Sequence, residues 1–253
     1  MRKAHRHRAV ACAIGAVAAA AASVAPVAPA DAKVTSAVTG RVLQVQGSDG
    51  KDRARVTCDS TGNAKVNGAN PDGGGIACST IFEVDATTGG GSDVIDFSGI
   101  SSAFGEARFP GFGVGTGTAA IGGPGNDRYI PSPVAFNLFF GEAGDDRARG
   151  GPARDVLNGG AGSDDLDGAD GRDSLVGEAG DDRLVGGTAG DLLAGGNGDD
   201  ALFGEAGADV LGGGPGRDKL RGGPGRDRLV GGADKDDLQG GAGKDTEIET
   251  DPK

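Results

Sequence analysis

Residues 141–176 read GEAGDDRAR-GGPARDVLN-GGAGSDDLD-GADGRDSLV, four units of a nine-residue pattern that continues without insertion to Ile248. Position one is Gly and position six is Asp in all twelve units, and position eight is Leu in ten of them. A period of nine excludes the collagen triple helix, which requires Gly at every third residue. The repeat therefore predicts another kind of regular backbone.

Each fixed position of the repeat has a physical interpretation. Gly residues let a six-residue turn adopt positive φ and bring its carbonyl groups close to a common point. The Asp at position six adds a carboxylate to that ring of carbonyls, and Ca²⁺ prefers hard oxygen ligands in a flexible loop, about six to eight per ion. Position eight is the middle of a short strand, and its Leu points inward. The unit is thus a calcium-type loop followed by a strand.

Two units are expected to make one full coil, because one turn and one short strand carry the chain only halfway round. Loops eighteen residues apart then stack, about 4.8 Å from one coil to the next, and the position-six carboxylates form two columns of candidate metal ligands. One column holds Asp146, Asp164, Asp182, Asp200, Asp218 and Asp236. The other column holds Asp155, Asp173, Asp191, Asp209, Asp227 and Asp245. Like charges so placed repel unless cations lie between them, and the gaps between coils allow up to about ten Ca²⁺ ions.

The pattern G-G-x-G-x-D-x-U-x resembles the calcium-binding nonapeptide of RTX (hemolysin-type) proteins. The resemblance covers residues 141–248. It implies a parallel β-roll, with Ca²⁺ held between successive turns by loop carbonyls and the position-six aspartates. We therefore expect an all-β fold, a β-solenoid of nonapeptide repeats. The alternative is a glycine-rich disordered tract without metal. Such a tract would not need Asp at every position six and Leu at nearly every position eight, so the regular pattern argues against it.

Two stretches before the main array approximate the same unit. Residues 122–130 read GGPGNDRYI, and their Asp127 lies nineteen residues before Asp146, one coil plus one inserted residue. Residues 89–95 read GGGSDVI and place Asp93 at position six. Asp93 and Asp127 are therefore added to the candidate metal ligands.

Residues 101–140 are interpreted as degenerate repeats around that clean unit. Residues 131–140 contain neither Gly nor Asp, so we interpret them as a half-coil whose calcium loop is replaced by an apolar loop. Phe136, Phe139 and Phe140 then either fill the interior where the coil changes size or form an exposed docking patch.

Residues 33–100 predict short strands separated by Gly-Ser-Asp-Gly and Asn-Pro-Asp-Gly turns. We interpret this segment as the β-rich cap of the same solenoid; an independent small β domain is the alternative. Cys58 and Cys78 form an even pair in an exported chain and predict one disulfide, with two buried free thiols as the alternative.

Residues 1–32 have the pattern of a cleaved secretory signal. Basic residues precede an Ala/Val run that is too short for a spanning helix, and a small-residue site follows at Ala30-Asp31-Ala32. No later segment is apolar enough to span a membrane, so we expect an extracellular protein. RTX proteins commonly leave the cell through an uncleaved C-terminal signal, whereas here only residues 249–253 follow the last repeat.

Composition narrows the function. The chain has 25 Lys and Arg against 37 Asp and Glu, a net charge of −12, which favours cationic partners and argues against nucleic acid. Both histidines, His5 and His7, lie in the predicted signal segment. The mature chain then cannot build a Ser-His-Asp triad, a Cys-His pair or a His-ligated metal site, and we expect a protein that is not an enzyme.

The calcium-binding function leaves the biological role open between a structural and a surface-interaction module. One alternative is a secreted hydrolase with paired carboxylates, but catalysis needs a unique pair whereas these Asp residues repeat on a lattice. Another is an adhesin-like or ice-binding solenoid, which would need a flat repeated face of Thr or apolar residues. Position seven instead mixes Arg, Val, Asp and Ser along the array.

Overall fold

The computed structural model describes residues 34–39, 42–67, 71, 75–80, 83–100, 107–109, 113–115, 117–134 and 136–249. The chain divides into two units, Met1–Ala32 and Lys33–Lys253. The predicted signal segment, residues 1–32, lies outside the described residues, all of which belong to the second unit.

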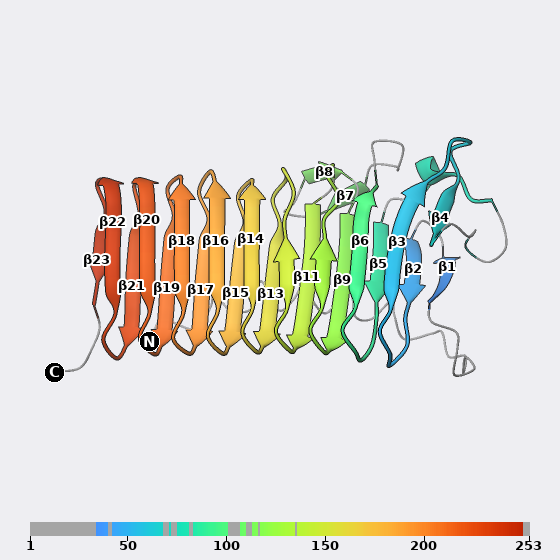
Figure 1. Ribbon diagram of the computed structural model, residues 1–253. Coiled ribbons are helices and arrows are strands. Elements are labelled where there is room, and N and C mark those ends of the chain that lie inside the picture. Colours follow the sequence, from blue (N-terminus) through green and yellow to red (C-terminus); the bar gives the residue numbers. More distant parts are fainter. Residues whose placement is uncertain are drawn as a thin grey trace, which may run out of the picture. The chain divides into compact units, whose positions relative to one another are not determined.

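Two long sheets make up this unit (Figure 1). Sheet A contains, in spatial order, β1 (Thr35–Thr39), β2 (Val42–Gln46), β5 (Glu83–Thr87), β9 (Gly117–Pro124), β11 (Phe136–Ala143), β13 (Val156–Ala161), β15 (Ser174–Ala179), β17 (Leu192–Asn197), β19 (Val210–Pro215), β21 (Arg228–Ala233) and β23 (Thr246–Ile248). Sheet B contains β22 (Asp237–Gly243), β20 (Lys219–Gly225), β18 (Ala201–Ala206), β16 (Arg183–Thr188), β14 (Asp165–Asp170), β12 (Arg147–Arg149), β10 (Arg128–Ile130), β6 (Val94–Gly99), β3 (Arg53–Cys58) and β4 (Ala64–Val66). A small separate pair is formed by β7 (Ala107–Phe109) and β8 (Gly113–Gly115).

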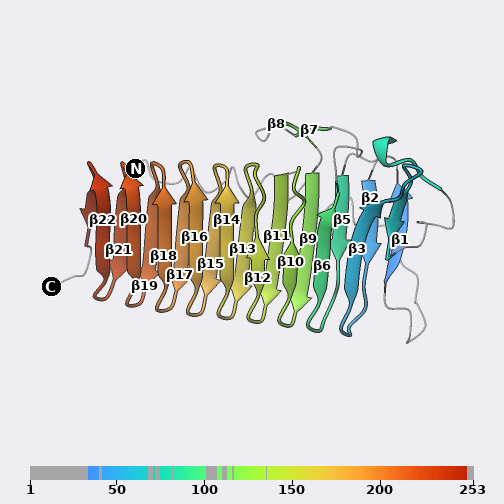
Figure 2. The ribbon, with the colours of Figure 1, turned by 45° about the horizontal axis from the view of Figure 1, so that its top comes forward.

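Along the repeat array the chain alternates between the two sheets, so each coil contributes one strand to each (Figures 1 and 2). Within a sheet neighbouring strands pair in parallel, and residues eighteen apart are register partners, as with Leu157 and Leu175. In these two sheets the antiparallel pairs, β1 with β2 and β3 with β4, lie at the N-terminal end. The expected parallel β-solenoid is confirmed.

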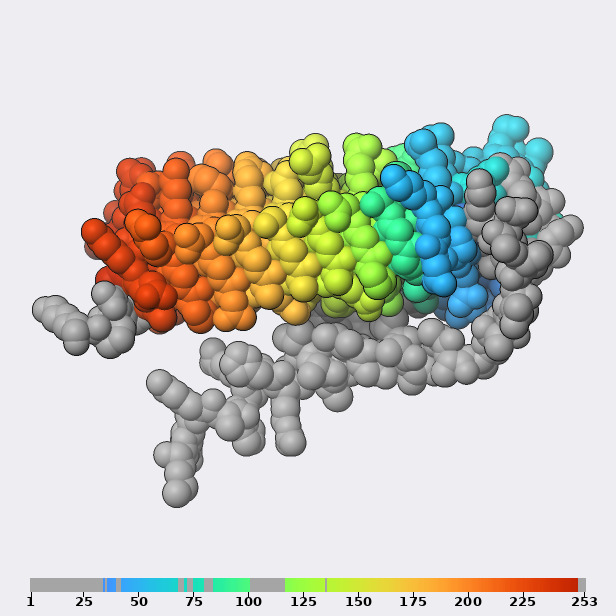
Figure 3. All heavy atoms as spheres, turned by 60° about the horizontal axis from the view of Figure 1, so that its bottom comes forward, coloured from blue at the N-terminus to red at the C-terminus, as the bar shows by residue number. Residues whose placement is uncertain are grey.

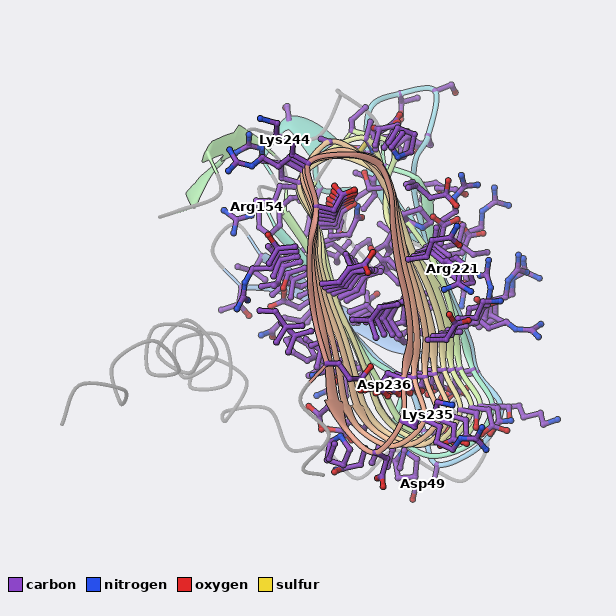
Figure 4. The ribbon with its side chains drawn as sticks, turned by 90° about the vertical axis from the view of Figure 1, so that its left-hand side faces the viewer. Asp49, Arg154, Arg221, Lys235, Asp236 and Lys244 are labelled. Atoms are coloured by element: carbon purple, nitrogen blue, oxygen red, sulfur yellow. A yellow bond between two sulfur atoms is a disulfide. The ribbon has the colours of Figure 1, made fainter. Side chains whose placement is uncertain are left out.

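The strand alternation explains the core. Position eight points between the sheets, and positions seven and nine point to solvent, because successive side chains of a strand face opposite sides. Viewed along the axis, the coils form a flattened tube filled by stacked side chains (Figure 4). The position-eight leucines that are fully or almost fully buried are Leu157, Leu166, Leu175, Leu184, Leu193, Leu202, Leu211, Leu220 and Leu229.

Successive coils pack against one another as parallel ridges, visible where the edge of the tube comes forward (Figure 3). In most repeats three residues separate consecutive strands at the narrow edges, as between β15 and β16. Among the described residues no helix is long and apolar enough to cross a membrane; the 3-10 helix η2 spans only Cys78–Thr80.

Aromatic side chains fill the interior where the leucine ladder ends. Phe139 is the register partner of Leu157 and is fully buried. Its ring stacks on that of Tyr129 at 5.4 Å between centroids, and Tyr129 meets Phe97 edge-on at 5.8 Å. The interior interpretation is therefore right for Phe139, whereas Phe140, the next residue of the strand, lies on the outer face of sheet A.

The loop of residues 131–140, expected to be apolar, carries a buried amide at the place of position six. Leu138 is the register partner of Val156, so the residue before it, Asn137, lies beside Asp155 of the next coil. Asn137 is fully buried and its backbone N–H donates to Asp155 Oδ1 at 2.6 Å. An amide thus takes the place of the carboxylate in this coil.

The strands of residues 42–99 belong to the same two sheets as the repeats. β2 and β5 continue sheet A, and β3 and β6 continue sheet B. The disulfide predicted from the sequence joins Cys58, at the end of β3, to Cys78 in η2, with 6.2 Å between their Cα atoms. The free-thiol alternative is therefore wrong.

Candidate metal centre

The loops at the two narrow edges of the tube carry the position-six aspartates, nearly all of them buried. Each aspartate is tied to the next coil, because the backbone N–H of one donates to the Oδ1 of the aspartate eighteen residues later. The Asp164 N–H, for example, donates to Asp182 Oδ1 at 2.8 Å, and the Asp191 N–H donates to Asp209 Oδ1 at 2.8 Å. The two predicted columns therefore exist as continuous hydrogen-bonded ladders.

The first column, on the edge where sheet A turns into sheet B, is longer than the sequence predicted. It contains Asp52, Asp93, Asp127, Asp146, Asp164, Asp182, Asp200, Asp218 and Asp236. The second column, on the opposite edge, contains Asp155, Asp173, Asp191, Asp209, Asp227 and Asp245. Figure 4 shows Asp236 and Lys235 at one narrow end of the tube, and Lys244 and Arg154 at the other.

The sequence prediction of the first column did not include Asp52, because Asp52 does not lie at the regular spacing of the repeats. The residues around it, 47–55, read GSDGKDRAR, with Gly at positions one and four, Asp at position six and the buried Ala54 at position eight. Asp52 lies forty-one residues before its stacking partner Asp93. A separation of forty-one residues is not a multiple of nine, so the repeat period does not point to Asp52. The nonapeptide motif of residues 47–55 was the signal that could have identified it.

The second carboxylate oxygen of most position-six aspartates has no partner. Within the described residues the Oδ2 atoms that are buried without a hydrogen bond belong to Asp93, Asp127, Asp146, Asp164, Asp173, Asp182, Asp191, Asp200, Asp209, Asp218, Asp227 and Asp236. Buried polar atoms are nearly always satisfied in folded proteins, so a ladder of unpaired oxygens calls for a cation, a water or a proton at each site. A cation in each loop would satisfy these oxygens.

Backbone carbonyls converge on the same places. A Cβ added to Gly168 would lie 2.6 Å from Asp173 Oδ2 and 2.6 Å from the Gly186 carbonyl oxygen of the next coil. At Gly204 the corresponding distances are 2.6 Å to Asp209 Oδ2 and 2.7 Å to the Gly222 oxygen. Position one is therefore a small cradle lined by one carboxylate oxygen and one carbonyl oxygen.

This cradle corrects the expected role of the first glycine. Positive φ occurs at positions two and four of the loops, for example φ 111° at Gly187 and φ 126° at Gly180. No position-one glycine of the twelve repeats has a positive φ. Gly stands at position one because a side chain would collide with the carboxylate and the neighbouring carbonyl.

Side chains alone do not complete a metal site. Among the described residues no three His, Cys, Asp or Glu side chains come together around one point. A cation in these loops would therefore take at most two ligands from aspartates and the others from carbonyl groups. That donor set of hard oxygens on flexible loops fits Ca²⁺.

Burial raises the pKa of these carboxyl groups. Desolvation, reinforced by the carboxylates of adjacent coils, raises the pKa of Asp173 to about 8 and those of Asp146 and Asp200 to about 7. The same burial raises the pKa of Asp182 and Asp191 to about 6. Because burial disfavours an isolated carboxylate, binding of either a proton or a cation near neutral pH would stabilise these loops.

A family model described as the RTX calcium-binding nonapeptide repeat matches residues 140–175, 176–211 and 212–247. The chain carries RTX calcium-binding repeats. Each match covers a block of four RTX nonapeptides, and the three blocks together cover the array that carries twelve of the aspartates. The loops of Asp52, Asp93 and Asp127 lie outside the matched residues yet continue the same column. A comparison with curated proteins finds no match.

One RTX loop of the array differs from the others. The Gly151 N–H donates to Asp155 Oδ2 at 2.6 Å, while the backbone N–H and side-chain Nδ2 of Asn137 both donate to Asp155 Oδ1. Asp155 is therefore fully satisfied by protein donors. Of the twelve repeat aspartates it is the least suited to bind a cation.

Asn137 is held by a buried polar network. Its Oδ1 accepts hydrogen bonds from the hydroxyls of Tyr129 and Thr118, at 2.8 and 2.9 Å, and from the Ser132 N–H at 3.0 Å. This network begins the second column without a carboxylate. Neutral side chains replace the Asp ladder at its N-terminal end.

Proposed function

We propose that this protein is an exported calcium-binding β-roll that serves as a structural or surface-interaction module rather than as an enzyme. The observation that supports it is the ladder of buried, unpaired aspartate Oδ2 atoms beside converging carbonyl oxygens. Bound Ca²⁺ would neutralise these carboxylates and link each coil to the next. The candidate ligands are the position-six aspartates of both columns, with Asp155 the exception.

The array itself argues for a non-catalytic role. General acid-base chemistry depends on two carboxyl groups whose environments separate their pKa values. Here the carboxyl groups share one environment, repeated along each edge, and burial shifts their pKa values in the same direction. The repeat suits many equivalent ions, up to about ten in the twelve units. Export would follow from cleavage after the signal segment, which mass spectrometry of the secreted chain tests.

Calcium removal tests the proposal on the full mature chain. Circular dichroism at pH 8 should show the β signal with calcium and lose most of it in excess chelator, because metal binding is linked to folding. Magnesium at the same concentration should not restore the signal, since Mg²⁺ demands tight octahedral geometry and retains its waters. A β signal indifferent to chelation would contradict the proposal.

A matched pair of variants links the ions to the loops. Asp182→Asn removes one carboxylate from the first column, whereas Asp165→Asn removes one from the solvent face of sheet B, where its side chain is 46% exposed. Calorimetry should show fewer bound Ca²⁺ ions for Asp182→Asn and an unchanged number for Asp165→Asn. Equal stoichiometry for both variants would rule out the loops as binding sites.

A further inference from the structure

The two sheets present different faces to solvent. On sheet B, position seven carries charge in most coils of the array and just before it: Arg128, Arg147, Asp165, Arg183, Lys219 and Asp237. Several of these form ion pairs across strands, such as Arg183 with Asp165 at 2.8 Å. Sheet B is therefore a solvated, charged surface.

Sheet A carries no charge at positions seven and nine of six neighbouring strands, β9 to β19, while Glu142 and Glu178 are exposed at position two, near the ends of β11 and β15. Its outward positions seven are Ala119, Leu138, Val156, Ser174, Leu192 and Val210. Its outward positions nine are Ile121, Phe140, Asn158, Val176, Ala194 and Gly212. The mixture seen at position seven in the sequence is thus sorted by the fold, because alternate units belong to different sheets.

Two apolar side chains at the C-terminal end of this run of strands are unusually exposed. Leu192 is 51% exposed and Val210 is 38% exposed, and the two are register partners on β17 and β19. The other large apolar side chain in the described residues with comparable exposure is Val134, in a loop. The pair lies midway between β13 and β23, a stretch in which Arg228 is the charged residue among positions seven and nine. Neighbouring exposed apolar side chains at such a place are typical of the central anchors of an interface.

We propose that sheet A is the interface of a two-fold symmetric dimer in which two copies of this chain pack face to face. A two-fold axis along the strands between β17 and β19 sets Leu192 of each copy across from Val210 of the other. The axis also sets β15 across from β21 and β13 across from β23, so that Arg228 of each copy faces Ser174 of the other rather than a second cation. A contact of this kind is isologous and closes at two copies.

Area and charge favour a second copy as the occupant. The axis overlaps six strands, β13 to β23. At a spacing of about 4.8 Å and a length of about 20 Å these give a footprint of roughly 600 Å² on each copy, about 1,200 Å² in total. That is the lower end of the range for specific protein interfaces. Two chains of net charge −12 repel overall, and this face lets them meet without placing like charges opposite each other.

Sedimentation equilibrium of the calcium-loaded full chain tests the dimer. We expect a monomer–dimer equilibrium that Leu192→Lys weakens by roughly thirtyfold or more, the effect of losing a central anchor. Val210→Lys should weaken it comparably, because each residue lies across from the other. The matched control, Ala201→Lys, occupies position seven on sheet B and should leave the dissociation constant within about threefold. Circular dichroism establishes that each variant keeps its fold.

A charge-pair variant tests the geometry. In the double variant L192K/V210E each lysine lies across from a glutamate of the other copy, so association should be tighter than in either single variant. A folded wild-type chain that stays monomeric at every concentration would overturn the dimer while leaving calcium binding intact. So would oligomers that grow beyond two copies, or a dimer insensitive to Leu192→Lys. Binding of monomers to phosphatidylcholine vesicles, lost in Leu192→Lys, would instead assign this face to a lipid surface.

Discussion

At the scale of single residues, the loops depend on the absence of a side chain at position one. A Cβ on Gly177 would collide with Asp182 Oδ2 and lie 2.7 Å from the Gly195 carbonyl oxygen of the next coil. A Cβ on Gly212, at position nine of sheet A, would meet nothing within 4 Å. Gly177 therefore cannot accept a side chain without a collision, whereas Gly212 can.

Gly177→Ala should destabilise the calcium-loaded protein by about 1–3 kcal/mol, because the added methyl overpacks the cradle and displaces the Asp182 carboxylate. Gly212→Ala should leave stability unchanged or raise it by up to about 1 kcal/mol, since alanine restricts the unfolded chain. Urea unfolding at saturating calcium measures both. Equal destabilisation by the two substitutions would contradict the cradle.

The buried carboxyl groups also predict how the metal-free chain responds to pH. An unfolded Asp titrates near pH 4, whereas burial raises the pKa in the folded state to about 6 for Asp182 and about 8 for Asp173. Between these values the folded state binds more protons than the unfolded state, so its stability falls as pH rises. Below the unfolded pKa the full contribution is present.

Metal-free protein, prepared by dialysis, should therefore keep more β signal at pH 5 than at pH 8. Saturating calcium should reverse the trend, because calcium and protons compete for the same carboxylates. A pH series of circular dichroism spectra with and without calcium measures this. A metal-free stability that rises from pH 5 to pH 8 would show that the carboxyl groups are not buried as described.

At the scale of elements, the two loop columns begin differently. The first column continues as aspartates to Asp52, whose Oδ2 accepts hydrogen bonds from the backbone N–H and hydroxyl of Ser48. The second column ends at Asp155 and passes to Asn137, Thr118 and Tyr129. A polar network of protein groups thus closes one column while the other remains acidic.

Asp155→Asn should accordingly leave the number of bound calcium ions unchanged, whereas Asp173→Asn should reduce it. Asp155 has both oxygens occupied by N–H donors, while Asp173 has an unpaired Oδ2. Calorimetric titration of the two variants beside the wild type makes the comparison. Loss of an ion from Asp155→Asn would show that its hydrogen bonds give way to metal.

At the scale of the whole unit, the coils form a one-dimensional stack in which each coil contacts mainly its neighbours. Every ion held between coils would therefore support the binding of the next. Calcium titrations of the full chain should be cooperative, with half-saturation near 10⁻⁴ to 10⁻³ M, the range typical of extracellular modules. Non-cooperative binding at submicromolar calcium would contradict this expectation.

The period of nine was enough to predict the inward leucines and the two stacked columns, and the resemblance to RTX repeats implied the parallel β-roll. Those features depend on residues close in sequence, since each unit repeats the same loop and strand. The upstream loop of Asp127 could also be placed, because its motif is intact and only one residue is inserted. These predictions rest on the residue types within one repeat unit and on the regular spacing of the units.

Other features were decided only by the tertiary structure, because they depend on which coil lies against which. Asp52 joins the first column across forty-one residues of chain, and Asn137 enters the second column in a coil without the motif. The collision that keeps position one as Gly involves a carbonyl of the next coil. The separation of a charged face from a largely uncharged one appears only when alternate units are assigned to opposite sheets, since the repeat position decides whether a side chain points outward and the sheet decides on which face it lies.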